Sequence, residues 1–260
     1  MKAQLIQILS LIIFLMPAAW VSAAHIHTPQ KLRATRMAFI PGGSYKPLFK
    51  QRGEPAKELI KPFLMDVHAV TNEQYLAFVK ANPEWRRSKV KRIFADKFYL
   101  RKWEGDLVLG DKVNPDAPVT DVSWYAANAY CKWAGLRLPT VSEWEYAANA
   151  CEYKAGKEGK KELNGKLLAR YSEKPPEKLP DVESCGRNSL GVYDMDGLIR
   201  EWTYDFNNNY ITGSAICGGG SGDASDPANY PAFIRYGFFS SLKANYSLDI
   251  LGFRCVKDVK

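Results

Sequence analysis

The sequence predicts a single, loop-rich domain of mixed helices and strands. Its 260 residues, 46% of them apolar and 25% charged, suffice for one globular core and exclude a disordered tail or a collagen-like rod. Nineteen Gly and fifteen Pro accompany seven Trp, fourteen Tyr and twelve Phe, which predicts long connections held by aromatic rings. No self-similarity at a fixed period is present, so an array of short repeats is excluded.

The first 24 residues have the pattern of a secretory signal peptide. Lys2 precedes an apolar run from Leu5 to Met16, and small residues at 21–24 suit cleavage after Ala24. The run is too short to span a bilayer comfortably, although a retained anchor is the alternative. We therefore expect a periplasmic or secreted chain with no membrane span after cleavage, in which residues 25–35 form a polar lead-in.

The net charge of +8 comes largely from two basic segments, residues 86–102 and 154–178. A basic stripe with interleaved aromatic residues could hold a nucleic acid. An exported protein seldom meets nucleic acid, however, and glutamates dilute the second segment. We interpret both segments as solvated loops that favour an acidic partner protein.

Two strands are predicted before the first helix. Residues 37–40 precede a Pro-Gly-Gly turn, as at the end of a strand, and residues 62–70 form a second apolar stretch. This second strand would contain His68. Because the chain has three histidines, two of them in the lead-in, we expect no histidine-based zinc site. We interpret His68 as a structural residue and not as the base of a serine hydrolase.

Capping residues predict three helices. Two capping boxes each predict the start of a helix. Thr71 with Gln74 opens a helix that stops before Pro83. Thr140 with Glu143 opens the helix SEWEYAANA. A serine at 123 caps the helix WYAANAYCKWA, which a following glycine ends. Beyond residue 150 we expect mostly turns and short strands.

Five cysteines are expected in an oxidising compartment. They are Cys131, Cys151, Cys185, Cys217 and Cys255. The odd count leaves at least one thiol unpaired, or paired between chains. No Cys-x-x-Cys motif occurs, which excludes a thioredoxin-like redox pair.

Several sequence blocks carry a resemblance to a known family. They are MAFIPGG at 37–43, FLMDVHAVTNEQY at 63–75, PVTDVSWYAANAYCKWAGLRLPTVSEWEYAA at 118–148, GVYDMDGLIREW at 191–202, GGS at 219–221 and LGFRC at 251–255. In this order they resemble the formylglycine-generating enzyme family, also called sulfatase-modifying factors, over residues 36–258. The resemblance implies a single α+β domain with little regular secondary structure, distantly similar to C-type lectins.

The same resemblance implies a disulfide between Cys131 and Cys255. Closing so long a loop would stabilise the fold by about 4–5 kcal/mol in the chain-entropy description. We expect a second bridge between Cys151 and Cys185, because these two cysteines flank the lysine-rich segment. This scheme leaves Cys217 as the free thiol.

The resemblance also implies a structural calcium ion in the block at residues 191–202. The implied ligands are the side chains of Asp194 and Glu201 and the backbone carbonyls of Gly197 and Ile199. Carboxylates and carbonyls in a tight turn are the hard oxygen donors that calcium prefers. The alternative is a turn in which Asp194 and Asp196 accept hydrogen bonds from backbone amides.

The copper centre of the family's oxidases is not expected here. Those members hold Cu(I) between two thiolates, which suit this soft ion. Three and eight positions after Ser221, where the thiolates belong, this chain has Ala224 and Asn229. The family's Trp before the Glu-Trp pair is Arg200 in this sequence. We therefore expect no formylglycine-generating activity.

The segment ICGGGSGDASDPANYPAFIRYGFFSSLKANYS at 216–247 is similar to exported, NirV-type members that accompany copper nitrite reductases. This similarity predicts an accessory or maturation role for a periplasmic metalloenzyme. Copper itself has two other candidate sites. Cleavage after Ala24 would expose His25 and His27 near a free amine, a copper(II)-binding pattern, although a polar tail is the alternative. Cys217 could bind a soft metal or form a mixed disulfide, or be a small buried residue.

Three classes of function stay open. The first is an accessory protein that holds a partner polypeptide in the family's substrate groove. The residues expected around that groove are Asp223, Tyr230, Phe233, Arg235 and Tyr236. The second is an oxidoreductase with a remodelled site, for which Cys217, Ser221 and Asp223 are the catalytic candidates. The third is a lectin-like binding module with structural calcium alone.

Overall fold

The computed structural model describes most of the domain. The described residues are 36–49, 55–149, 162, 164–169, 171–173, 176–195, 197–207 and 229–259. The predictions for the signal peptide and lead-in, and those for His25, His27, Cys151, Asp196, Cys217, Ser221, Asp223 and Ala224, lie outside these residues. No helix in the described part of the chain has the length and apolar character to cross a membrane.

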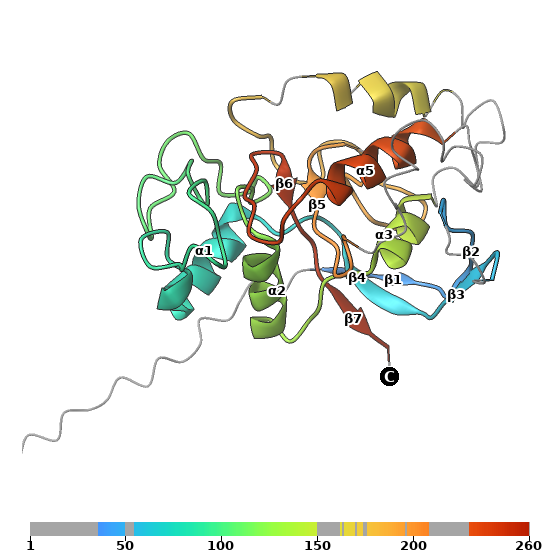
Figure 1. Ribbon diagram of the computed structural model, residues 1–260, viewed down its shortest axis with the longest axis horizontal. Helices are drawn as coiled ribbons and strands as arrows, with labels where there is room; N and C mark the ends of the chain where they lie inside the picture. Colours follow the sequence, from blue (N-terminus) through green and yellow to red (C-terminus); the bar gives the residue numbers. More distant parts are fainter. Residues whose placement is uncertain are drawn as a thin grey trace, which may run out of the picture. The chain divides into compact units, whose positions relative to one another are not determined.

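The strands form three small sheets (Figure 1). The strands are β1 (Met37–Ile40), β2 (Gly43–Tyr45), β3 (Glu58–Ile60), β4 (Phe63–Asp66), β5 (Arg200–Glu201), β6 (Leu251–Gly252) and β7 (Val256–Asp258). The sheet β1-β4-β7 and the pair β2-β3 are antiparallel, whereas β5 and β6 are parallel. The predicted strand at 37–40 is confirmed.

The second predicted strand is wrong in its extent, because β4 ends at Asp66. The Cys255 N–H donates to the Asp66 carboxylate at 2.9 Å, whereas a continued antiparallel ladder would use the Asp66 carbonyl. The chain therefore leaves the sheet, and His68 lies in a bend outside the strand. Its ring Nδ1 lies 2.8 Å from the Ala69 carbonyl oxygen.

The three predicted helices are confirmed as α1 (Asn72–Ala81), α2 (Trp124–Trp133) and α3 (Val141–Ala148). Both capping boxes are closed, and Ser123 accepts the Ala126 N–H at 3.1 Å. Gly135 follows α2 with φ +73°, a conformation that glycine adopts without strain. The short 3-10 helix η1 (Pro83–Trp85) begins after α1.

The expectation of mostly turns and short strands beyond residue 150 did not include the helices found there. Helix α5 (Tyr230–Ser240) occupies eleven residues, and residues 164–169 are also helical. The Asn229 side chain accepts the Ala232 N–H at 3.2 Å, and Pro231 lies in the first turn. An Asn cap followed by an early Pro is a helix-start pattern, so the sequence contained the signal.

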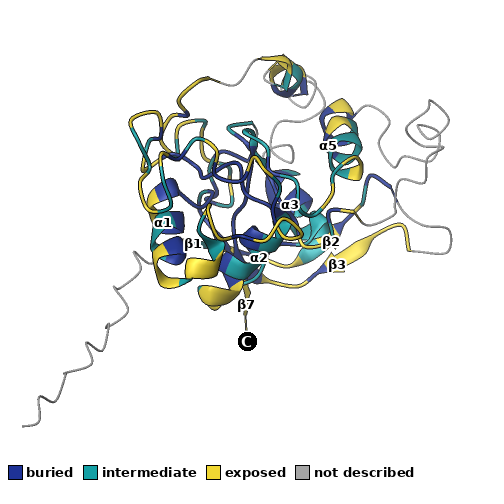
Figure 2. Ribbon diagram, turned by 60° about the vertical axis from the view of Figure 1, so that its left-hand side comes forward, coloured by how far each residue is buried: buried dark blue, intermediate teal, exposed yellow. Residues whose placement is uncertain are grey.

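The largest buried cluster is aromatic and lies around Tyr75. The ring of Tyr75 lies 5.3 Å from Phe78, 5.8 Å from Tyr130 and 6.1 Å from Phe253, measured between centroids. Figure 2 shows that much of the buried chain runs in irregular segments between the helices and strands. Rings from distant segments therefore replace regular layers as the framework of this α+β domain.

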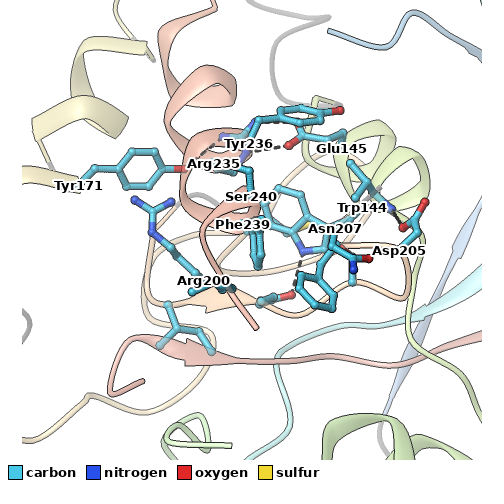
Figure 3. Close-up of a pocket in the computed structure, with 17 residues that line it drawn as sticks. Trp144, Glu145, Tyr171, Arg200, Asp205, Asn207, Arg235, Tyr236, Phe239 and Ser240 are labelled. Carbon is cyan, nitrogen blue, oxygen red and sulfur yellow. Dashed lines mark hydrogen bonds and ion pairs between the residues drawn. The ribbon is translucent and has the colours of Figure 1, made fainter. Parts of the chain in front are cut away.

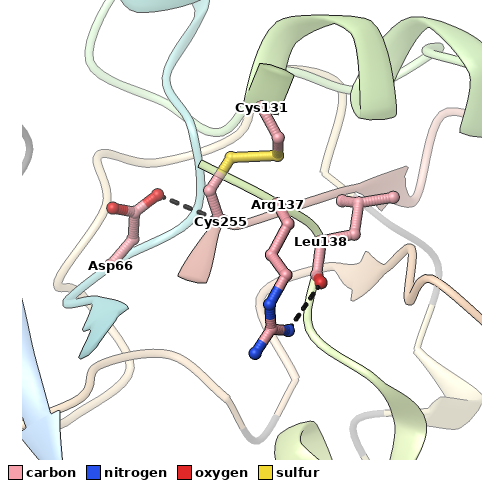
Figure 4. Close-up of a disulfide and its surroundings, with 5 residues drawn as sticks. All are labelled: Asp66, Cys131, Arg137, Leu138 and Cys255. Carbon is pink, nitrogen blue, oxygen red and sulfur yellow. Dashed lines mark hydrogen bonds between the residues drawn. A yellow bond between two sulfur atoms is a disulfide. The ribbon is translucent and has the colours of Figure 1, made fainter. Parts of the chain in front are cut away.

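The predicted disulfide between Cys131 and Cys255 is present and joins α2 to the segment before β7 (Figure 4). Its two Cα atoms are 5.9 Å apart, although 124 positions separate them in sequence. The second predicted bridge requires correction. Cys185 is a free, half-buried cysteine, so it does not pair with Cys151 in this structure.

Candidate functional site

A cavity of about 310 Å³ lies between α3, α5 and β5 (Figure 3). Helix α3 contributes Trp144 and Glu145, and α5 contributes Arg235 and Phe239. Spacings of three and four residues place side chains on one face of a helix, so each helix turns one such face to the cavity. Arg200 of β5 completes the wall. Arg200 stands where the family resemblance implies a Trp.

A buried ion pair joins α5 to α3. Arg235 donates from Nε and Nη2 to the two carboxylate oxygens of Glu145, at 2.8 and 2.6 Å. Its Nη1 donates to the Tyr171 hydroxyl at 3.1 Å. Although burial opposes its charge, the Glu145 carboxylate holds the pKa of Arg235 well above its usual value. Arg235 thus lines the cavity as a buried cation that is paired with Glu145.

Sequence reasoning missed Glu145. The available signal was its place beside Trp144 on the apolar face of a short capped helix, where an acidic residue needs a partner. The partner lies 90 positions later in the sequence, so no local pattern identifies it. The sequence gives no comparable signal for Tyr171.

A second buried ion pair lies beside the first. Arg254 donates from Nε and Nη2 to the carboxylate of Glu201, at 2.6 and 2.7 Å. The Trp144 indole N–H donates to the same carboxylate at 2.9 Å. Two long-range pairs and one indole hydrogen bond therefore hold the cavity wall at fixed positions.

Arg200 is placed differently from both paired arginines. Its guanidinium carbon lies 4.3 Å from the centre of the Tyr171 ring and 4.7 Å from that of Phe238. Its Nη1 atom is buried and has no hydrogen-bond partner. Burial lowers the pKa of Arg200, and the positive charge of Arg235 acts in the same direction.

The three carboxylates that line the cavity each have a hydrogen-bond or ion-pair partner within the protein. Asp205 accepts the Val141 N–H at 2.8 Å, at the start of α3, and burial raises its pKa. Glu145 and Glu201 are engaged by arginines. Among the residues that the structure describes, no group of three His, Cys, Asp or Glu could hold a metal ion.

Asn229 occupies one of the two positions at which the family's oxidases carry a copper thiolate. Its side chain is buried and caps α5. The amide oxygen serves the helix and offers no soft ligand. The other position, Ala224, lies outside the described residues but carries no metal-binding side chain in any conformation.

The implied calcium ligands form a tight turn next to β5. Asp194 has φ +60°, and its carboxylate accepts the backbone N–H of Cys185 at 2.7 Å and that of Glu183. Burial raises the pKa of Asp194, and the negative charge of Glu201 adds to this effect. The Arg254 guanidinium already pairs with Glu201 and also lowers the pKa of Asp194. Both Asp194 oxygens accept backbone N–H groups, as in the alternative to calcium, while the oxygen donors themselves are of the type that calcium prefers.

The expected aromatic groove requires correction. Tyr230 is exposed over 61% of its surface. Phe233 and Tyr236 instead pack edge-on against Phe49, with ring centroids 5.2 and 5.3 Å apart. Two of the three aromatic residues therefore fix α5 to the chain near β2 and are not free for a partner.

Comparisons with known proteins agree with this fold. The sequence profile of the family "Sulfatase-modifying factor enzyme 1-like domain" matches residues 22–259. The solved structure of PvdO from Pseudomonas aeruginosa superposes with a TM-score of 0.50 at 20% identity, covering 86% of this chain and 94% of PvdO. This structural likeness concerns the fold alone.

Two curated relatives are similar in sequence. The serine/threonine-protein kinase Pkn1 of Chlamydia trachomatis is 31% identical over 256 residues, which cover 89% of this chain. The match covers 39% of Pkn1, so the chain spans less than half the length of that relative. A formylglycine-generating enzyme of Thermomonospora curvata is 30% identical over 231 residues, which cover 69% of this chain and 74% of the relative.

Proposed function

The chain belongs to the sulfatase-modifying factor enzyme 1-like domain family, and on this premise we propose that it is an exported accessory or maturation factor for a periplasmic metalloenzyme, such as a copper nitrite reductase. It uses the fold to hold a partner polypeptide and does not generate formylglycine. The similarity of residues 216–247 to NirV-type members motivates the choice of partner.

The observation that carries this proposal is the role of Asn229. A helix cap, buried and hydrogen-bonded to Ala232, occupies a position where an oxidase needs a thiolate. Ala224 leaves the other position without a ligand as well. Without either thiolate, these positions cannot form a linear two-sulfur site for Cu(I). The copper ion that would react with dioxygen therefore has no ligands there.

A first experiment tests the loss of oxidase activity. Purified protein is incubated with Cu(I), dioxygen, a thiol reductant and a cysteine peptide from a sulfatase, and the peptide is analysed by mass spectrometry. We expect the peptide to keep its thiol. Appearance of the aldehyde would overturn the proposal. The double variant Ala224→Cys, Asn229→Cys serves as a matched control, since it should gain Cu(I) affinity in a chelator competition.

A second experiment tests the accessory role. A copper nitrite reductase is produced in the periplasm with and without this chain, and its copper content per subunit is measured after purification. We expect higher copper occupancy when the chain is present. Equal occupancy, together with no complex between the two purified proteins in analytical ultracentrifugation, contradicts the role.

Calcium would support this function as a structural ion. The side chains of Asp194 and Glu201 and the carbonyls of Gly197 and Ile199 would hold it, and its charge would offset two neighbouring buried carboxylates. We expect millimolar calcium to raise the melting temperature of chelator-treated protein, and Asp194→Ala to abolish the rise. An equal rise in both proteins would assign the effect to other sites.

Copper(II) binding at the amino terminus is a further proposal that depends on export. Cleavage after Ala24 leaves His25 first and His27 third, next to a free amine. Intact-mass analysis of the exported protein gives the cleavage position. If it follows Ala24, we expect one visible copper(II) band that is lost in His27→Ala.

A further inference from the structure

The cavity contains one arginine, Arg200, that the accessory role does not explain. Arg235 pairs with Glu145, and the adjacent Arg254 pairs with Glu201. Arg200 forms an ion pair with none of the carboxylates in the described residues. A guanidinium group removed from water without a counter-ion is costly, so a cavity that retains one is complementary to an anion.

The surroundings of Arg200 determine where an anion can bind. The Tyr171 ring, which Figure 3 shows beside Arg200, lies 4.3 Å from the guanidinium carbon, and the Phe238 ring lies 4.7 Å from it. Ring stacking occupies the faces of this planar group and leaves its N–H edge for hydrogen bonds. Nη1 lies on that edge and has no hydrogen-bond partner.

The rest of the cavity suits an apolar body. Trp144, Phe206 and Phe239 contribute rings to its lining. Among the polar groups nearby, the Trp144 indole N–H donates to Glu201, whereas the buried Thr203 hydroxyl has no hydrogen-bond partner. The volume of about 310 Å³ is at the lower end for small-molecule sites, which suits a ligand the size of a single aromatic acid.

We propose that this cavity binds a small organic carboxylate with an aromatic or branched apolar body, and that Arg200 is the residue that recognises its carboxylate. The edge of a guanidinium matches a carboxylate through two parallel hydrogen bonds. A phosphate dianion is a poorer match, because it carries more charge than the one unpaired guanidinium of the described lining offsets. The site is independent of any metalloenzyme partner.

Binding is tested with purified full-length protein and three probes, benzoate, phenylacetate and N-acetylphenylalanine, by isothermal titration calorimetry. Benzamide, which has the same ring without the charge, and inorganic phosphate are the comparison ligands. We expect at least one carboxylate to bind and both comparison ligands to bind at least ten-fold more weakly. Failure of all three carboxylates, or equal affinity for benzamide, overturns the proposal.

The assignment to Arg200 is tested with substitutions. Arg200→Gln should weaken the best carboxylate by about 10- to 100-fold, the loss typical of a charged hydrogen-bond partner. Arg200→Lys keeps the positive charge but cannot form two parallel hydrogen bonds. Its affinity for the carboxylate should therefore lie between that of the unmodified protein and that of Arg200→Gln. Arg187→Gln is the matched control, because Arg187 stacks on the Tyr193 ring at 5.8 Å and is not part of the cavity lining.

Each variant is first checked for an unchanged circular dichroism spectrum and melting temperature, so that a loss of binding reports on the site. Because Arg200 is half-buried and its Nη1 atom has no hydrogen-bond partner, we expect Arg200→Gln to melt no lower than the unmodified protein. Unchanged affinity in this folded variant, or an equal loss in Arg187→Gln, would show that Arg200 does not recognise the carboxylate.

Discussion

The aromatic core around Tyr75 and the cavity between α3 and α5 are built on opposite principles. In the core, rings from α1, α2 and the C-terminal segment pack around Tyr75, and the disulfide closes one side. Around the cavity, two buried ion pairs connect elements that lie far apart in the sequence. The first region depends on burial and covalent closure, and the second on charges that must remain matched.

The largest expected loss of stability comes from removing the disulfide between Cys131 and Cys255. The disulfide closes a loop with a sequence separation of 124, so Cys131→Ser should cost about 5 kcal/mol of unfolding free energy in the chain-entropy description. Urea denaturation under non-reducing conditions measures this cost. Cys185→Ser is the matched control and should change stability by less than about 0.5 kcal/mol, since this thiol is free. Equal effects would mean that the disulfide does not stabilise the core.

Charge matching around the cavity is tested by breaking one pair. Glu145→Gln leaves Arg235 buried without a counter-charge and should cost about 3–5 kcal/mol. Replacing both partners, Glu145→Leu with Arg235→Met, should recover most of that loss, because no unpaired charge remains. If the double variant is as unstable as the single one, the cost comes from lost packing and not from charge.

Removing one polar group from the aromatic core should cost less stability than breaking an ion pair at the cavity. Tyr75→Phe removes one hydroxyl hydrogen bond to Tyr99, 2.8 Å long, and Tyr99 keeps its bond to the Trp85 carbonyl. We expect a cost of about 1 kcal/mol in the same denaturation experiment. A cost near that of Glu145→Gln would remove the contrast between the two regions.

The pH dependence of stability arises at Asp66, between the two regions. Burial raises the pKa of Asp66 to about 7, and one of its carboxylate oxygens has no hydrogen-bond partner. The folded state therefore keeps a proton that the unfolded state releases near its usual pKa of 3.8. Stability should fall, on the order of 4 kcal/mol in total, as pH rises from about 4 to 7, and then level off.

The variant Asp66→Asn has no ionisable group at this position. Urea unfolding at several pH values should show that this variant loses the larger part of the slope between about pH 4 and 7, whereas the unmodified protein retains it. Because the amide oxygen can still accept the Cys255 N–H, the variant should keep the native contact on that side. A slope that persists in Asp66→Asn would assign the titration to another carboxyl, such as Asp121, whose pKa burial raises to about 6.

The smallest expected effect is at the cap of α5. Asn229→Ala should cost about 1 kcal/mol, the usual value of a lost helix cap, and Asn229→Asp should be close to neutral. Thermal denaturation at constant pH compares the two variants. A larger loss in Asn229→Ala would indicate that Asn229 also supports the cavity that α5 lines.

The two regions also differ in how far the sequence predicts them. The core helices were predictable because capping boxes, such as Thr71 with Gln74, are local patterns. The Cys131–Cys255 bridge followed from family resemblance. The ion pairs of the cavity were not predictable, since Arg235 meets its partner across 90 positions and charge alone does not identify a partner. Helix α5 was missed although Asn229 and Pro231 indicated it.

The position of the disulfide has a consequence during synthesis. Cys131 emerges long before Cys255, and Cys151, Cys185 and Cys217 all emerge in between. In an oxidising compartment, each of these three thiols is available to Cys131 before its native partner exists. Correct pairing therefore has to follow the docking of the C-terminal segment against α2, so the native crosslink is a result of folding and calls for an isomerase whenever oxidation comes early.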